Sequence, residues 1–484
     1  MSFVDLPNEI ILQIAEEQEP PDINALLRTN RRLAFCLIPS LWASIFRSSP
    51  QLYAVEALLS AAENENKDVV RRLLDRGILQ YSQTPLWKIM RKVIIERDTK
   101  TLRTLIECGM SIDAIDPDDW TLLGLAAEQG CLEKLLLLVA QGFDINAPGN
   151  FRGESPLGLA AKNQHDEVVQ VLLSLPGIDV NPKTELASNT PLHSAAKEGD
   201  EIIVKILLAD ERIDVNPMNS NCWTPLHIAA DEGHEGVVDL LLAHRDIKTD
   251  LPEDSGKTPI HIAACSGHSS IVRRLLNDQS VNSLDNYHRT PLYLASMEGH
   301  ESVVQLLLQH NGVKVNLAER AGKGPMHIAA CEGSEGIVQT LLEDERVEVD
   351  IKDDYGRTPL WWAAMERHEG IVRLLLSDDR VDVNRRNNHG QTILHIMAGH
   401  WGDEAIVQLL LSHEKTIPDL CDNDGRTPLY WAVMKEHDAV VRLLPGDPNN
   451  PSLLQTYCPL IKLTTHQRSI ATQPSSSPCT FNAT

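Results

Sequence analysis

The sequence predicts an all-α solenoid, a row of about twelve similar helix-turn-helix units joined by hairpin loops. A segment of the type Thr-Pro-Leu-His recurs at steps close to 34 residues, as from Thr224 to Thr258 and from Gly324 to Thr358. Within each copy, apolar residues return at helical spacing. The composition is 42% hydrophobic but only 4% aromatic, which favours short helices packed through Leu, Ile, Val and Ala.

The copy from Thr224 to Leu242 shows how one unit is expected to fold. Thr224 can cap the first helix, and the proline after it stands at a first-turn position that needs no free N–H. Gly233 can adopt the left-handed conformation that ends this helix. The second helix carries four apolar residues on one face: Val237, Val238, Leu241 and Leu242. Neither helix is long enough to be stable alone, so the units must stack.

The copies are aligned on the residue that matches Thr224. A degenerate first copy lies at Glu56, and the others lie at Thr84, Thr121, Ser155, Thr190, Thr224, Thr258, Thr290, Gly324, Thr358, Thr392 and Thr427. The Thr84 copy departs most, because Ile89-Met90 replaces the usual alanine pair and extra residues precede Gly109. We expect the array to be irregular there.

These copies resemble the ankyrin repeat. The clearest are TPLHSAAKEGD from Thr190, TPLHIAADEGH from Thr224 and TPIHIAACSGH from Thr258, and the resemblance covers about residues 52–445. It implies that Asp/Asn-rich turns such as Ile178 to Asn181 form projecting hairpins. It also implies that protein partners contact the hairpin tips and the exposed end of each first helix.

Candidate target-binding residues follow from that resemblance. They are the tip residues and one residue of a glutamate ladder on the first helices: Trp120, Trp223, Glu232, Tyr287, Arg289, Tyr355, Arg357 and Arg426. Trp, Tyr and Arg dominate the energetics of protein interfaces. The alternative is that these are common repeat residues on a solvated face. For the adjacent Trp361-Trp362, packing is the favoured explanation.

The first 48 residues do not share the repeat pattern. Proline and apolar residues predict three short helices, which on their own account could simply cap the solenoid. They also resemble an F-box, through Leu6-Pro7-x-Glu9-Ile10, Asp22-Ile23-x-Ala25-Leu26, Thr29-Asn30-Arg31-Arg32-Leu33 and Pro39-x-Leu41-Trp42. One departure is the acidic run Glu16-Glu17-Gln18-Glu19 at the end of the first helix.

The F-box resemblance implies that this segment binds a Skp-family adaptor of a cullin-type ubiquitin ligase. The residues at the family's apolar contact positions are Leu6, Pro7, Ile10, Ile14, Leu26 and Leu33. The preferred hypothesis is therefore a substrate-recruiting subunit, with an F-box-like domain over 1–48, an ankyrin solenoid over 49–445 and a disordered tail over 446–484. The alternative is a non-catalytic ankyrin scaffold whose N-terminal helices only cap the solenoid.

Catalytic and metal chemistry are not expected. The eighteen histidines are mostly periodic, so equivalent ones lie about 10 Å apart, too far to share a zinc ion. The resemblance implies that the first histidine of each copy, such as His227, bonds the threonine of its own motif. Gly256-Lys257-Thr258 lacks the upstream glycine of a phosphate-binding loop, and the cysteines form no C-x-x-C pair. We expect no enzyme activity, no metal and no cofactor.

The charge balance narrows the partners. Lys and Arg number 44 against 68 acidic residues, a net charge of −24, which argues against nucleic-acid and anionic-membrane surfaces. Neither a secretory signal nor a long apolar stretch is apparent. We expect a monomeric protein of the cytoplasm, the nucleus or both.

Overall fold

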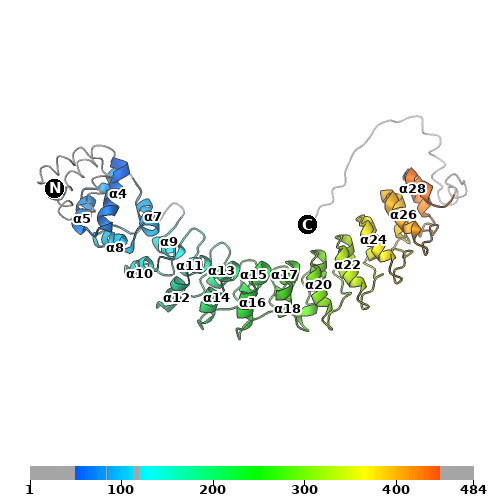
Figure 1. The fold of residues 1–484 in the computed structure, drawn as a ribbon, viewed down its shortest axis with the longest axis horizontal. Coiled ribbons are helices and arrows are strands. Elements are labelled where there is room, and N and C mark those ends of the chain that lie inside the picture. Colours follow the sequence, from blue (N-terminus) through cyan, green and yellow to red (C-terminus); the bar gives the residue numbers. More distant parts are fainter. Residues whose placement is uncertain (1–49, 83, 113–118, 447–484) are drawn as a thin grey trace, which may run out of the picture. The chain divides into compact units, whose positions relative to one another are not determined.

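The computed structural model describes residues 50–82, 84–112 and 119–446, and every regular element within these ranges is a helix. The chain divides after Asp254 into two compact units, here called unit 1 and unit 2. The described part of each unit contains six helix pairs (Figure 1). The predicted all-α array of about twelve helix-turn-helix units is therefore confirmed for these residues. The six F-box-like contact residues and the tail after Gly446 lie outside them.

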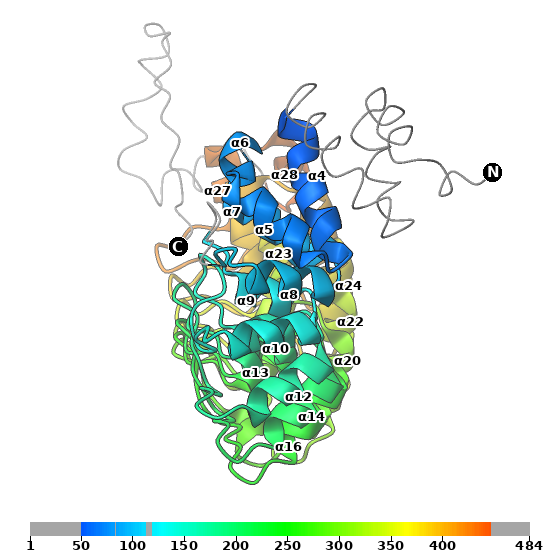
Figure 2. The same ribbon diagram turned by 90° about the vertical axis from the view of Figure 1, so that its left-hand side faces the viewer.

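Unit 1 stacks its helix pairs in two rows. The pairs are α4 (Pro50–Glu63) with α5 (Lys67–Asp75), α7 (Leu86–Glu96) with α8 (Thr99–Glu107), α9 (Leu122–Glu128) with α10 (Leu132–Ala140), α11 (Pro156–Lys162) with α12 (Asp166–Ser174), α13 (Pro191–Glu198) with α14 (Glu201–Leu208), and α15 (Pro225–Glu232) with α16 (Glu235–Leu242). The first helices α9, α11, α13 and α15 pack in sequence order, as do the second helices α12, α14 and α16 (Figure 2).

Unit 2 repeats this arrangement. Its pairs are α17 (Pro259–Cys265) with α18 (Ser269–Leu275), α19 (Pro291–Met297) with α20 (Glu301–Leu308), α21 (Pro325–Cys331) with α22 (Glu335–Leu342), α23 (Pro359–Met365) with α24 (Glu369–Leu376), α25 (Ile393–Ile396) with α26 (Glu404–Ser412), and α27 (Pro428–Met434) with α28 (Asp438–Leu443). A short 3-10 helix η2 (Ser280–Asn282) follows α18, and a π-helix η3 (Met397–Trp401) continues α25.

The repeat from Thr224 to Leu242 folds as its residues predict. The Thr224 hydroxyl accepts a hydrogen bond from a first-turn N–H of α15, and Gly233 ends the helix with φ at 82°. In α16, Val237, Val238 and Leu241 are fully buried. The alanines of α15 are fully buried, and this helix packs against the neighbouring first helix α13. Helices of only eight residues are thus stabilised by packing between neighbouring repeats rather than by their intrinsic helix propensity.

The expected irregularity lies at the start of the array. Helix α7 has eleven residues instead of seven or eight, and an additional short helix α6 (Ile78–Ser82) precedes it. The alignment was wrong in detail at two positions. Pro85 rather than Thr84 precedes α7, and the Thr84 hydroxyl donates to the Ser82 carbonyl instead of capping the helix. Glu56 lies inside the fourteen-residue α4 and pairs with Lys92 and Arg97 of the next repeat.

Asparagines in the turns after the second helices form hydrogen bonds between consecutive repeats. The Asn181 amide donates to the Arg212 carbonyl at 2.9 Å, and its oxygen accepts from the Asp214 N–H at 2.9 Å. The same pair of bonds recurs at Asn146, Asn216, Asn282, Asn316 and Asn384. We call this series the asparagine ladder. It explains why the turns predicted as hairpins carry asparagine at a fixed place.

Where many repeats have a glycine after the second helix, several copies here carry Asp-x-Arg. Arg212 pairs with Asp210 and also donates from Nη2 to the Leu173 carbonyl at the end of α12, at 2.9 Å. Arg346 and Arg380 make the equivalent bonds to the carbonyls of Leu308 and Leu342. The arginine therefore donates a hydrogen bond to a helix-end carbonyl of the preceding repeat.

Candidate protein-binding surface

The surface formed by the first helices and the loops that precede them is called the inner face here. Its histidines are structural. In unit 1, His193 Nδ1 lies 2.9 Å from the Thr190 hydroxyl, and its Nε2 lies 2.9 Å from the Trp223 carbonyl of the next repeat. Burial lowers the pKa of His193 to about 4, so its ring is neutral at pH 7. His261 and His327 of unit 2 have similarly lowered pKa values of about 4, also because of burial.

A second histidine series holds several of the second helices against the preceding repeat. The ring of His234 contacts Gly199, where an added Cβ would lie 2.6 Å from it, and Nε2 lies 2.9 Å from the Lys197 carbonyl. His300 and His368 make the same contacts in unit 2. These glycines are thus required both for their left-handed backbone and for the imidazole above them. Among the described residues, no cluster of His, Cys, Asp or Glu could hold a metal ion.

Three loop tips of unit 2 are built around buried aspartates that were not singled out in the sequence: Asp285, Asp353 and Asp422. The Asp353 carboxylate accepts the N–H groups of Tyr355 and Arg357 at 2.9 and 2.8 Å. Its other oxygen accepts from Arg357 Nε at 2.8 Å and from the Trp362 indole at 3.2 Å. Asp285 and Asp422 make the corresponding bonds to Arg289 and Arg426.

The tip arginines also lie over aromatic rings. The Arg357 guanidinium is 4.5 Å from the centre of the Tyr355 ring and 4.1 Å from that of Trp362. Arg289 lies over Tyr287, and Arg426 lies over Trp431. Burial alone would raise the pKa of Asp422, but hydrogen bonds from Arg426 and Trp431 lower it overall. The tip arginines therefore fix the loop conformation, in addition to any contact with a partner.

The structure groups some of the candidate target-binding residues and separates others. Tyr287 is 53% exposed and stacks with Arg289, and Tyr355 is 62% exposed and stacks with Arg357. Arg426 lies at a later tip of the same unit. In unit 1, Trp120 and Trp223 are only half-buried, and the Trp223 ring leans toward His227 at 6.0 Å. Glu232 is exposed at the end of α15.

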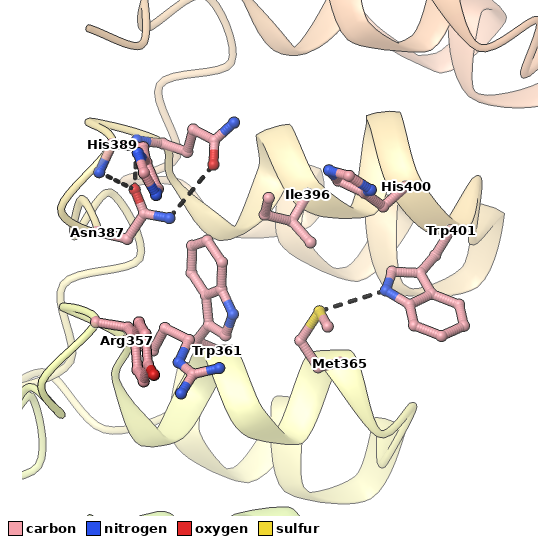
Figure 3. A pocket seen from close by; sticks show the side chains of 10 residues that line it. Arg357, Trp361, Met365, Asn387, His389, Ile396, His400 and Trp401 are labelled. Carbon is pink, nitrogen blue, oxygen red and sulfur yellow. Dashed lines mark hydrogen bonds between the residues drawn. The ribbon is translucent and has the colours of Figure 1, made fainter. Parts of the chain in front are cut away.

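A hollow of about 430 Å³ lies on the inner face of unit 2, between α23 and the segment formed by α25 and η3 (Figure 3). We call it the aromatic groove. It contains two of the predicted residues, Tyr355 and Arg357, and its remaining lining is Trp361, Met365, Asn387, His389, Gln391, Ile396, His400 and Trp401. Its size is within the range of ligand-binding clefts.

The π-helix shapes one end of this groove. From Thr392 the next aligned threonine is Thr427, one residue more than the usual 34, and the extra residue is accommodated in η3 before Gly402. This places Trp401 at the surface, 52% exposed, with its indole N–H 3.3 Å from the sulfur of Met365. His400 instead stacks on Trp431. Single-turn π-helices are frequent at functional sites.

Sequence reasoning missed most of the groove. It treated Trp361 as a packing residue, and the side chain is indeed only 6% exposed, yet one edge lines the groove. It did not single out Trp401, although the 35-residue step and the sequence Gly399-His400-Trp401-Gly402 marked a departure from the repeat. The insertion was the available signal.

The loops, capped first helices and stacked pairs define a class of protein built as a repeat array for binding other proteins. A family model described as ankyrin repeats (3 copies) matches residues 89–184, 157–252, 245–319, 312–387 and 379–452. The chain therefore belongs to the ankyrin-repeat family, as the resemblance implied. Ankyrin repeats are typically non-catalytic modules, so the chain is a protein-interaction scaffold. Within the described ranges, no helix has the length and apolar character needed to cross a bilayer.

Proposed function

We propose that this scaffold is the substrate-recruiting subunit of a cullin-type ubiquitin ligase. Residues 1–48 would bind a Skp-family adaptor through Leu6, Pro7, Ile10, Ile14, Leu26 and Leu33. The inner face of the repeats would bind the target and present it to a separate enzyme. The observation that carries the proposal is the order of F-box landmarks directly ahead of an ankyrin array. The chain would act in the cytoplasm, the nucleus or both.

A second candidate is a scaffold in which the N-terminal residues only cap the array. A cleft of about 500 Å³ between α4 and α7 supports it, because this is the first part of the array that follows residues 1–49. The cleft combines apolar Val55, Ile89 and Ile95 with charged residues of both signs: Glu56, Lys88, Arg91, Lys92 and Glu96.

Adaptor retention distinguishes the two candidates. We expect the full chain to retain a purified recombinant Skp-family adaptor in a pull-down, and the double variant Leu6→Ala with Pro7→Ala to lose it. The matched control is Tyr287→Ala with Tyr355→Ala, which changes exposed side chains of unit 2 and should retain the adaptor. Failure of the unmodified chain to retain the adaptor contradicts the ligase role and leaves the capped scaffold.

A further inference from the structure

The aromatic groove has an apolar half and a polar half. Trp401, Met365, Trp361 and Ile396 form its apolar half, which runs between α23 and η3 (Figure 3). Asn387, His389 and Gln391 of the loop between α24 and α25 form the other half, together with Tyr355 and Arg357. An exposed tryptophan beside such a cleft is the kind of anchor on which protein interfaces depend.

The loop that forms the polar half is basic, although the chain as a whole is acidic. From Asn384 to Gln391 it contains Arg385 and Arg386 and no carboxylate. Both arginines are exposed, and the Arg386 guanidinium bonds the backbone carbonyls of Gly390 and Cys421 rather than an acid. Its positive charge is therefore not neutralised by those contacts. Lys352 adds a further cation, since its Nζ donates to the Arg386 carbonyl at 2.9 Å.

The aromatic faces at the loop side of the groove are already taken by a cation. Arg357 lies 4.5 Å from the Tyr355 ring centre while its Nε bonds Asp353. A lysine or arginine of a partner would meet this guanidinium instead of a bare ring face. Glu366 follows the groove residue Met365 in the chain and is exposed. The charges thus favour an acidic group over the loop and an apolar group next to Trp401.

We propose that the aromatic groove binds an extended peptide segment that carries a large apolar side chain next to an acidic one. The apolar side chain enters between Trp361, Met365 and Trp401, and the acidic side chain lies over the loop that contains Arg385 and Arg386. This inference deepens the proposed function, on which it rests for the identity of the segment as part of a recruited target. The one-residue insertion in η3 is the feature that creates the site.

The test is fluorescence anisotropy of the full chain with four labelled synthetic peptides. The probes are GSEWLEGSG, its charge-reversed form GSKWLKGSG, its neutral form GSQWLQGSG and the acidic form without apolar residues, GSESSEGSG. We expect saturable binding that is strongest for GSEWLEGSG. Trp401→Ala and Tyr355→Ala should each weaken that binding by about tenfold or more, as removal of an interface anchor does. Arg385→Gln should bring the acidic probe close to the neutral one.

The matched control is Tyr287→Ala, which changes the corresponding loop tyrosine two repeats earlier, outside the groove. It should bind GSEWLEGSG like the unmodified chain, and thermal unfolding should show that all variants are folded. Three results would overturn the proposal: absence of saturable binding, preference for the lysine probe, or binding of GSEWLEGSG by Trp401→Ala and Tyr355→Ala that is as tight as that of the unmodified chain. Adaptor retention is measured separately, so the ligase role and the peptide preference can fail independently.

Discussion

The loop tips at Asn219 of unit 1 and Asp285 of unit 2 share one set of backbone hydrogen bonds but differ in chemistry. In unit 1, the amide oxygen of Asn219 accepts the N–H groups of Asn221 and Trp223 at 3.0 and 2.9 Å. In unit 2, a carboxylate oxygen of Asp285 does the same for Tyr287 and Arg289, at 2.8 Å in both cases. Either side chain can shape the turn, because each offers an acceptor at the same place.

The difference lies in what the second side-chain atom requires. A buried carboxylate needs a cation, and the tips at Asp285, Asp353 and Asp422 supply an arginine four residues later. An amide at this place needs an acceptor: the buried Asn150 of unit 1 donates to Glu154, and the half-buried Asn387 of unit 2 donates to Gln391. The charged version adds an arginine stacked on an aromatic ring. Three tips of unit 2 therefore carry, at that fourth position, an arginine on an aromatic ring, which the asparagine tips at Asn150, Asn219 and Asn387 do not.

The largest expected effect tests whether this difference is confined to the loops. Leu241 of α16 and Leu375 of α24 occupy the same repeat position, and both are fully buried. We expect Leu241→Ala and Leu375→Ala each to lower the free energy of unfolding by about 2–5 kcal/mol, the usual cost of a buried truncation.

Hydrogen exchange should show the loss of protection concentrated in the mutated unit and its neighbours, because stability in a repeat array is built from local contacts. Costs that differ strongly between the two variants would show that the cores of the two units are not equivalent. Uniform loss of protection along the whole array would contradict the local character of its stability.

A smaller effect tests the aspartate tips directly. Arg357→Ala leaves the fully buried Asp353 carboxylate without its cation, and Arg357 itself is 24% exposed. We expect a loss of roughly 2–3 kcal/mol in the free energy of unfolding, below the full cost of breaking a deeply buried pair. The control is Gln391→Ala at an asparagine tip, which should cost only about 0.5–1.5 kcal/mol. Chemical denaturation of both variants gives the comparison.

The double variant Asp353→Asn with Arg357→Gln imitates the neutral pair Asn387–Gln391. It should recover much of the stability that Arg357→Ala loses, since no buried charge remains. If Arg357→Ala costs no more than Gln391→Ala, the aspartate tips have no greater need of their partner than the asparagine tips.

The repeated parts of the fold were predictable because each copy has the same local solution. Thr224, Pro225 and Gly233 specify the start and end of α15 through caps that need no distant residue. The prediction was weakest where the pattern broke: Glu56 lies within a longer helix, and Thr84 does not cap α7. Trp401 was missed for a related reason, since its exposure depends on how one inserted residue is absorbed by η3. Spacing alone does not specify a π-helix.

The smallest expected effect concerns the asparagine ladder, in which unit 2 has one aspartate. Asp350 accepts from the Asp382 N–H at 2.7 Å, but it has no amide to donate to the carbonyl of the next turn, and its Oδ1 has no hydrogen-bond partner. Burial raises the pKa of Asp350. We expect Asp350→Asn to raise the free energy of unfolding at pH 7 by about 1 kcal/mol, because the amide restores the missing bond.

The pH dependence identifies the cause of that gain. Because its folded pKa is raised, Asp350 binds a proton more readily in the native state, so its ionisation destabilises the protein as pH rises through that pKa. The advantage of Asp350→Asn should be full above the native pKa and shrink as pH falls below it. Buried neutral histidines such as His193 change stability in the opposite sense between about pH 6.5 and 4, but they cancel in the difference between variant and parent. Asn316→Asp, at the same ladder position one repeat earlier, should lower the free energy of unfolding at pH 7, and this loss should shrink as pH falls. A gain from Asp350→Asn that is the same at pH 4 and pH 8 would mean that carboxylate ionisation is not its origin.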